Sequence, residues 1–171
     1  MPSLLFDISK CIGCYACEVA CKQEHNLPVG PRLIRVEQVG PREIGGKLSL
    51  EFVPSTCRHC ENPPCSDVCP VEAIKRRDGV VLIDNEVCIG CKSCVEACPF
   101  GAIQLNPEEG MMLKCDMCIN RINKGLEPAC SHHCPTGAIC LIDVNEFSEI
   151  KRRKKADNMA ENKNREKILK Q

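Results

Sequence analysis

Sixteen of the 17 cysteines in this 171-residue chain fall into four groups of four, and this pattern constrains the fold more than any other feature. Group I comprises Cys11, Cys14, Cys17 and Cys21; group II comprises Cys57, Cys60, Cys65 and Cys69; group III comprises Cys88, Cys91, Cys94 and Cys98; and group IV comprises Cys115, Cys118, Cys130 and Cys134. Only Cys140 stands outside the groups. Thiols at this density either form disulfides or bind metal.

The start of the chain favours metal over disulfides. Its first residues, MPSLLFDISK, lack the basic region and following apolar stretch of a secretory signal, so we expect a cytoplasmic protein with reduced thiols. The alternative is export of a whole complex by a partner's signal. No apolar run approaches the ~18 residues of a membrane span. Because the chain has no Trp, one Tyr and four Phe, bound metal must help to hold it together.

Internal repeats accompany the cysteine groups. The segments CPVEAI (69–74), CPFGAI (98–103) and CPTGAI (134–139) share one pattern, and LFDISKCIGC (5–14) matches LIDNEVCIGC (82–91). Repetition of this kind indicates one small supersecondary unit that is used several times. The chain therefore looks like a duplicated unit that has been doubled again.

Turn signals and composition predict mostly short elements. We expect two strands, 33–39 and 48–53, around the turn GPREIGG (40–46), and a further strand at Gly79–Ile83. Helices of one or two turns are expected at Cys17–Glu24, Ser66–Cys69 and Val95–Cys98. A longer helix should follow Asn145, capped by Asn145 or Ser148, because good helix formers occupy that part of the chain.

Group III and Pro99 have the spacing C-x2-C-x2-C-x3-C-P, the signature of bacterial ferredoxins. In such a run three cysteines bind one [4Fe-4S] cluster, and the fourth binds the neighbouring cluster. Zinc sites use two C-x2-C pairs or mixtures of Cys and His, and they do not need runs of four cysteines. Because all sixteen positions are Cys, the sequence predicts four [4Fe-4S] clusters.

The order of the groups indicates which of them share clusters. Groups II and III are separated by 18 residues with one turn and one strand, as in a two-cluster ferredoxin, so we expect them to exchange their last cysteines. Groups I and IV then pair by elimination, although spacing alone also allows groups III and IV, 16 residues apart, to pair. The predicted ligand sets are set 1 (Cys11, Cys14, Cys17, Cys134), set 2 (Cys115, Cys118, Cys130, Cys21), set 3 (Cys57, Cys60, Cys65, Cys98) and set 4 (Cys88, Cys91, Cys94, Cys69).

The chain resembles a known family over about residues 3–143. The matching segments are CIGCYACEVACK (11–22), CRHCENPPCSDVCP (57–70), group III with FGAI (100–103), CDMCINRI (115–122) and CSHHCPTGAI (130–139). They are similar to four-cluster, ferredoxin-like electron-transfer subunits of molybdenum- and tungsten-pterin oxidoreductases, such as dimethyl sulfoxide reductase, formate dehydrogenase and tungsten aldehyde oxidoreductase-type enzymes. The resemblance implies that group I pairs with IV and group II with III. Family members are often longer, and some end in a membrane helix where this chain is basic and polar.

The repeats and the resemblance imply an α+β fold of two pseudo-symmetric, bacterial-ferredoxin-like (βαββαβ) units with short strands and helices and much loop. Residues 1–25 and 105–145 would form one two-cluster unit, 56–104 the other, and 26–55 an inserted β-hairpin. Residues 146–171 would form a basic helix or extension. Because residues 151–171 hold nine Lys/Arg and three Asp/Glu, this extension suits docking on an acidic partner.

Several residues beside the ligands have expected supporting roles. Each oxidised cluster with four thiolates carries a charge of about −2. Nearby cations would offset part of this charge, and an aromatic ring would shield the set 1 cluster from water; these residues are Lys22, Arg58, Lys92, Lys114 and Tyr15. Cys140 is expected to be a small buried residue on a strand, and His59, His132 and His133 should lie beside ligands without binding iron.

Four clusters in a row would conduct electrons, and the sequence predicts no catalytic site. No nucleotide-binding glycine pattern follows a strand, and the basic tail lacks the aromatic residues typical of nucleic-acid-binding segments. We therefore expect a non-catalytic electron-transfer subunit in a hetero-oligomer, without nucleic acid or a membrane span. Its partner would be a large catalytic subunit, a pterin enzyme by preference, with a flavin or other redox subunit beside it. The alternatives are a stand-alone polyferredoxin shuttle, a subunit of a hydrogenase or flavoprotein complex, and a structural metal module.

Overall fold

The computed structural model describes residues 2–168 and divides the chain into two compact units. One unit is Leu4–Leu141, and the other combines the two ends, up to Ser3 and from Ile142 onward. Within the described residues the strands pair only in twos: β1 (Pro2–Phe6) with β8 (Ile139–Asp143), β2 (Ile34–Ile44) with β3 (Lys47–Thr56), β4 (Ile74–Arg77) with β5 (Val80–Ile83), and β6 (Gln104–Leu105) with β7 (Met112–Leu113). The helices up to residue 141 are the 3-10 helix η1 (Ile8–Lys10), α1 (Ala16–Glu24), α2 (Pro64–Asp67), α3 (Ser93–Ala97), α4 (Ile119–Ile122) and α5 (Ala129–His132).

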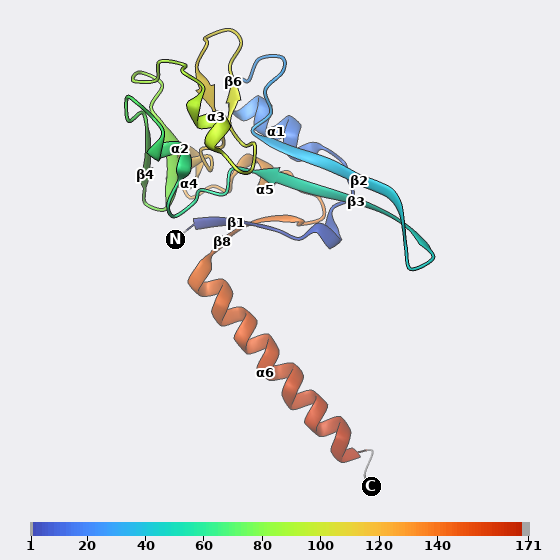
Figure 1. Ribbon diagram of the computed structural model, residues 1–171. Helices are drawn as coiled ribbons and strands as arrows, with labels where there is room; N and C mark the ends of the chain where they lie inside the picture. Colours follow the sequence, from blue (N-terminus) through green and yellow to red (C-terminus); the bar gives the residue numbers. More distant parts are fainter. Residues whose placement is uncertain (1, 169–171) are drawn as a thin grey trace. The chain divides into compact units, whose positions relative to one another are not determined.

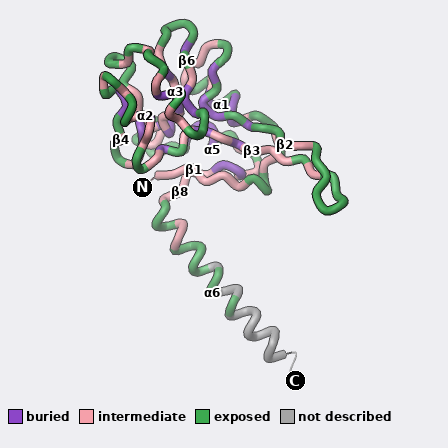
Figure 2. Tube along the Cα trace, in the orientation of Figure 1, coloured by how far each residue is buried: buried purple, intermediate pink, exposed green. Residues whose placement is uncertain are grey.

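The hairpin β2–β3 contains the longest strands, and Figure 1 shows it extending away from the short helices. Gly45 and Gly46 close the hairpin with φ angles of 57° and 75°, the left-handed pair that suits a two-residue turn. Figure 2 shows that the end of the hairpin is exposed. The two predicted strands are confirmed, and they are longer than expected.

The prediction of one turn over residues 40–46 is wrong, because β2 continues through most of that segment. The pairing register shifts between Val39 and Arg42, so a bulge accommodates Gly40 and Pro41. Proline cannot donate a ladder hydrogen bond and is tolerated in strands at such bulges. Pairing then resumes, and the strand reaches the two glycines.

The short helices α2 and α3 lie where two of the predicted helices were expected, but each ends before the expected last residue. Cys69 and Cys98, the cysteines predicted to end these helices, are not helical. Each precedes a proline, which disfavours the helical conformation of the residue before it. Cys98 accordingly has an extended backbone with φ −79° and ψ 111°. The chain direction therefore changes at the last cysteine of each of these groups.

The hydrophobic core consists of two clusters in which cysteines mix with aliphatic side chains. The first contains buried Cys17, Cys21, Cys130, Leu33, Ile34, Val36 and Ile139. The second contains buried Cys65, Cys94, Ile74, Val81, Ile103 and Met112. Cysteines of all four groups therefore contribute to the core, either as buried members or packed against it.

The unit that contains the chain ends includes α6 (Val144–Ile168). The Asp143 carboxylate caps it by accepting hydrogen bonds from the backbone N–H groups of Asn145, at 2.9 Å, and Glu146, at 3.4 Å. The prediction that Asn145 or Ser148 forms this cap is therefore wrong, because Asp143 precedes both and its carboxylate reaches the free amides. Residues 169–171 of the basic segment 146–171 lie outside the described residues.

The α+β class with short strands and helices is confirmed. The division into two βαββαβ units, and the unit boundaries with it, remain predictions. The strand predicted at Gly79–Ile83 is present as β5, and it pairs with β4 around Asp78 and Gly79, whose φ angles are 51° and 86°. The sequence reasoning missed η1, β1, β4, β6, β7, α4 and α5, all of which have five residues or fewer.

Candidate metal centres

The four thiols of set 3 surround one cavity. Its walls include Cys57, Cys60 and Cys65 of group II together with Cys98 of group III. The remaining wall is mostly apolar, from residues such as Val81 and Ile103. Three thiols of one group and the last thiol of the next group therefore face a common space.

The four thiols of set 4 line a second cavity. Cys88, Cys91 and Cys94 of group III meet Cys69 of group II there. Buried Ile74 and Met112 contribute to the wall, along with other aliphatic side chains. Groups II and III thus exchange their fourth thiols between the two cavities.

The thiols of set 2 lie close enough together to affect one another's ionisation. Burial first, and then the negative charges of Cys115, Cys130 and Cys118, raise the pKa of the Cys21 thiol far above its usual value. Cys21 belongs to α1, Cys130 to α5 and Cys118 precedes α4, so the fold assembles these thiols from distant segments. Because Coulomb effects decline with distance, Cys21 lies beside group IV.

Three thiols of set 1, those of Cys11, Cys14 and Cys17, lie close together at the start of α1. Burial above all raises the pKa of the Cys17 thiol to about 11, and the charges of Glu18, Cys14 and Cys11 add to the rise. Cys11 and Cys134 both pack against the core cluster that contains Cys17. The N–H of Asp7 donates to the carbonyl of Ala138 at 2.8 Å, which brings the segment before Cys11 to the segment after Cys134.

Backbone N–H groups donate to several of these sulfur atoms. The Sγ atoms of Cys57 and Cys115 each accept a hydrogen bond from the backbone N–H two residues later, at 3.4 and 3.3 Å respectively. The Sγ atoms of Cys69 and Cys98 each accept one from the backbone N–H four residues later, at 3.3 and 3.4 Å respectively. Donors of this kind stabilise negative charge on sulfur. The sulfur positions are therefore prepared for thiolates.

The glycine of each C-I-G-C segment allows a close approach of the chain. A Cβ at Gly13 would lie 2.6 Å from the Phe52 ring, and one at Gly90 would lie 2.5 Å from the carbonyl oxygen of Gly110. Both glycines have φ of 68°, a conformation that other residues seldom adopt. The tight loop between the first two cysteines of groups I and III thus requires glycine.

The donor set fits a [4Fe-4S] cluster. Four thiols converge on each of two cavities that no described side chain fills, and backbone amides donate to their sulfur atoms. A structural zinc ion would close the four thiols around a single atom with Zn–S distances of about 2.3 Å. An iron–sulfur cube is bulkier, and it needs one thiolate at each iron corner.

The five residues expected beside the clusters have different environments. Lys114 is buried and Arg58 is exposed, and both line the set 3 cavity. The Lys22 ammonium donates to the carbonyl of Pro28 at 2.7 Å, and Lys92 is exposed. Tyr15 is 38% exposed next to Cys14, so its shielding of the set 1 cluster stays a prediction.

The expectations for Cys140 and for the three histidines beside the ligands are met only in part. Cys140 lies on β8, but it is only half-buried, and its thiol donates to the carbonyl of Gly137 at 3.2 Å. His59 is buried and its Nδ1 accepts a hydrogen bond from the Val81 N–H at 3.1 Å. Its Nε2 has no hydrogen-bond partner among the described residues. Of the other two, His133 is exposed, and His132 ends α5.

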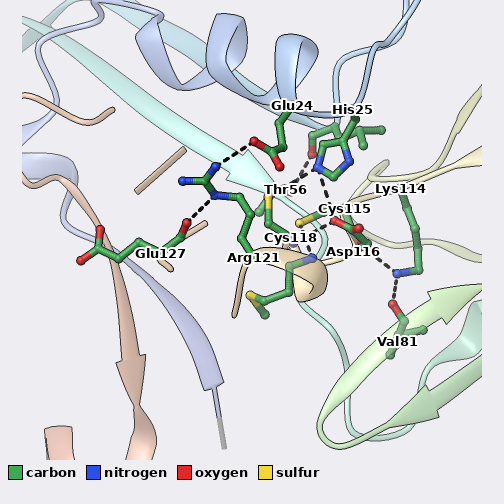
Figure 3. Close-up of polar contacts among 12 residues, drawn as sticks. Glu24, His25, Thr56, Val81, Lys114, Cys115, Asp116, Cys118, Arg121 and Glu127 are labelled. Atoms are coloured by element: carbon green, nitrogen blue, oxygen red, sulfur yellow. Dashed lines mark hydrogen bonds and ion pairs between the residues drawn. The ribbon is translucent and has the colours of Figure 1, made fainter. Parts of the chain in front are cut away.

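Sequence reasoning missed His25. Its Nε2 lies 3.4 Å from the Sγ of Cys118 and 3.4 Å from a carboxylate oxygen of Asp116, as Figure 3 shows. His, Asp and Cys are all metal ligands, but Cys118 already belongs to set 2, so the geometry favours a hydrogen bond to its sulfur. The position of His25, four residues after Cys21 at the end of α1, is the signal that it lies near set 2.

Comparison with known proteins gives matches over most of the chain. Residues 48–144 and residues 10–73 match two family models that are both described as 4Fe-4S dicluster domains. The chain is 43% identical over 152 residues to the thiosulfate reductase electron transfer subunit of Salmonella typhi, covering 87% of this chain and 79% of that protein. It is 40% identical over 149 residues to one of the chains of the anaerobic dimethyl sulfoxide reductase of Escherichia coli, covering 82% and 73%.

A further relative is longer. The chain is 40% identical over 146 residues to a subunit of the tetrathionate reductase of Salmonella typhimurium, and the match covers 84% of this chain and 58% of that protein. The chain thus spans less than two thirds of this relative. In the part of the chain that the structure describes, no helix combines the length and the apolar composition needed to cross a membrane.

Proposed function

This chain belongs to the dimethyl sulfoxide reductase family of iron–sulfur subunits, and on that premise we propose that it relays electrons through four [4Fe-4S] clusters for the catalytic subunit of a reductase complex. The cysteines of sets 1 to 4 would each hold one cluster. When bound, a [4Fe-4S] cluster gains or loses one electron without breaking bonds in the protein. The chain itself supplies the thiolates, the amide donors and the apolar walls.

One observation carries this proposal. Each of two cavities combines three thiols of one group with the last thiol of the other group, which is the arrangement that two neighbouring cubane clusters require. A set of independent zinc sites would not need this exchange. The proximity of Cys21 to three cysteines of group IV extends the same arrangement to sets 1 and 2.

The sets form a row in the order 1, 2, 3, 4. Burial and the charges of Cys115 and Cys118 raise the pKa of Cys130 in set 2 to about 12, and the charge of Cys17 in set 1 contributes to this rise. Burial raises the pKa of Cys115 in set 2 to about 11, and the charge of Cys57 in set 3 contributes. Burial likewise raises the pKa of Cys94 in set 4 to about 11, with a contribution from Cys65 in set 3.

The ends of this row are accessible. Cys14 of set 1 and Cys91 of set 4 are both exposed, whereas sets 2 and 3 include no exposed cysteine. Exposed end positions allow one partner to exchange electrons at set 1 and another at set 4. The inner thiols stay shielded from water by the surrounding chain.

The partner would be a large catalytic subunit of the molybdenum- or tungsten-pterin class. The relatives are named as parts of reductases for thiosulfate, tetrathionate and dimethyl sulfoxide, so a related reductase is the preferred assignment. Alternative catalytic partners of the same class are an aldehyde oxidoreductase and a formate dehydrogenase. The basic segment 146–171 would dock on an acidic face of such a partner.

Purification from the native organism tests the proposal. We expect about 16 iron atoms per chain, four one-electron components in a reductive titration, and co-purification of a large subunit that contains a pterin. A colourless zinc-loaded chain would refute iron–sulfur binding. A monomer that reduces several unrelated enzymes would instead indicate a free shuttle, and a partner with flavin or nickel would indicate a different complex.

A further inference from the structure

Lys114 occupies an unusual place between two of the ligand sets. In sequence it precedes Cys115 of set 2, yet its side chain lines the cavity of set 3. It is buried, with only 6% of its surface exposed. A long cationic side chain that points into the protein rather than into water needs a structural reason.

The ammonium group of Lys114 bonds only to neutral groups of the protein. Its Nζ donates to the carbonyl oxygens of Val81 and Cys115, the latter at 2.9 Å, as Figure 3 shows. Among the residues that the structure describes, Lys114 forms no ion pair with a carboxylate. These carbonyl groups accept two of its three N–H donors, but they leave its net charge without a counter-ion.

A buried charge without a counter-ion is costly, so the missing negative charge has to be found nearby. The thiols of set 3 are in the right place. All four of these thiols line the same cavity as the Lys114 side chain. A cluster held by four thiolates would bring a charge of about −2 into the same cavity.

The other basic residue that lines this cavity does not supply a buried positive charge. Arg58 is exposed and lies over the rings of Phe6 and Phe100, at 5.6 and 5.9 Å from their centroids. Water and salt screen its charge.

We infer that Lys114 is the built-in counter-cation of the cluster in set 3 and raises the reduction potential of that cluster selectively. The inference rests on the proposed function, because it needs an iron–sulfur cluster in set 3. On reduction the cluster gains one electron from the reductant, and its charge changes from about −2 to about −3. The ammonium attracts the more negative state more strongly and therefore favours the reduced form.

Redox titration of the cluster-loaded full chain, followed by electron paramagnetic resonance, tests this role. The variant K114Q keeps an amide donor but loses the charge, and K114R keeps the charge. We expect K114Q to lower the reduction equilibrium constant of one cluster at least tenfold, which is about 59 mV for one electron, and K114R to stay within threefold of the unmodified chain. The variant C60S should perturb the same spectral component, because Cys60 belongs to set 3.

The matched control is K92Q. Lys92 also adjoins a cysteine of a ligand set, but it is exposed, so water screens its charge. Its substitution should change each equilibrium constant less than threefold. The inference would be overturned if K114Q and the unmodified chain had the same reduction potentials. It would also be overturned if K92Q shifted a reduction potential as much as K114Q does.

Iron content separates the inference from the proposed function. Absence of iron–sulfur clusters from the unmodified chain would refute the proposed function itself. If K114Q loses about four iron atoms, the four of one cluster, while K114R retains them, the charge of Lys114 is needed to hold the cluster of set 3, which supports the inference. Loss of the same iron from both variants would overturn it, because the charge would then not be the decisive property.

Discussion

The Nε2 atom of His25 lies 3.4 Å from the Sγ of Cys118, although 93 residues separate them in the chain. The contact forms because His25 follows α1 directly, where its N–H bonds the carbonyl of Cys21 at 3.2 Å. Asp116 holds the same edge of the ring at 3.4 Å. A histidine absent from the predicted ligand sets therefore lies against a predicted cluster ligand.

Replacement of His25 by phenylalanine should lower the midpoint potential of the cluster in set 2. The imidazole N–H stabilises charge on the Cys118 sulfur, and that charge is larger when the cluster is reduced. Redox titration should show a fall for one component only. H25Q, which retains an N–H donor, should lie between H25F and the unmodified chain, and the same potential in all three would contradict the prediction.

Replacement of Cys21 by serine should damage the cluster of set 2 rather than that of set 1. Cys21 lies among Cys115, Cys118 and Cys130, while the other three cysteines of its own group belong to set 1. The resonance signal of set 2 should weaken or change to a three-iron form, with set 1 intact. C140S is the control, since Cys140 belongs to no set. Loss of the set 1 signal alone would refute the pairing of groups I and IV.

Replacement of Glu18 by alanine should lower stability by about 2–3 kcal/mol, because it breaks charged hydrogen bonds and leaves a buried N–H unpaired. One carboxylate oxygen of this buried residue accepts the Val36 N–H at 2.7 Å, and the other pairs with Arg32 at 3.0 Å. The measurement is the urea midpoint for loss of cluster absorbance. The control is E37A, which breaks the exposed Arg35–Glu37 pair and should have an effect below about 1 kcal/mol. Equal midpoints would count against the buried contact.

Replacement of Gly13 by alanine should destabilise the loop between Cys11 and Cys14. The added Cβ would lie 2.6 Å from the Phe52 ring, and φ is 68°. Strain and displacement of the ring together should cost about 2–4 kcal/mol. G137A is a matched control, because Gly137 has φ of 64° but no atom within 4 Å of the added Cβ. Iron release in urea should be fastest in G13A, and similar rates in both variants would exclude the ring contact as a cause.

Loading of clusters into the iron-free chain should improve as pH rises from about 6 to 8. Burial raises the pKa of Cys17 and Cys94 to about 11 and, with neighbouring thiol charges, that of Cys130 to about 12, so these thiols are protonated at neutral pH. Ligation requires thiolates and releases protons, so a lower pH opposes it. Iron incorporation at several pH values, with proton release followed in weak buffer, checks this. Loading that is independent of pH would contradict the expected protonation state.

The sequence was most informative where a short motif has one chemical use. The spacing of group III, and its repetition, predicted iron–sulfur chemistry and the family without any knowledge of the fold. Local rules also predicted α1, β5 and the hairpin β2–β3, because turn residues and apolar patterns act over a few positions. Very short elements such as β6 and α4 were missed, since so few residues carry almost no pattern.

Tertiary structure alone decided what surrounds each cysteine. Lys92 and Lys114 both adjoin a cysteine of a ligand set in the sequence, yet only Lys114 is buried in a cavity lined by four thiols. Likewise, the spacing from Cys21 places His25 near set 2, but no local pattern indicates that His25 contacts Cys118 or that Glu18 bonds the backbone of β2. Motifs specify which ligands a chain offers, because ligation depends on the type and spacing of nearby residues. Burial, counter-charges and hydrogen bonds to those ligands depend on segments far apart in the chain, and only folding brings these together.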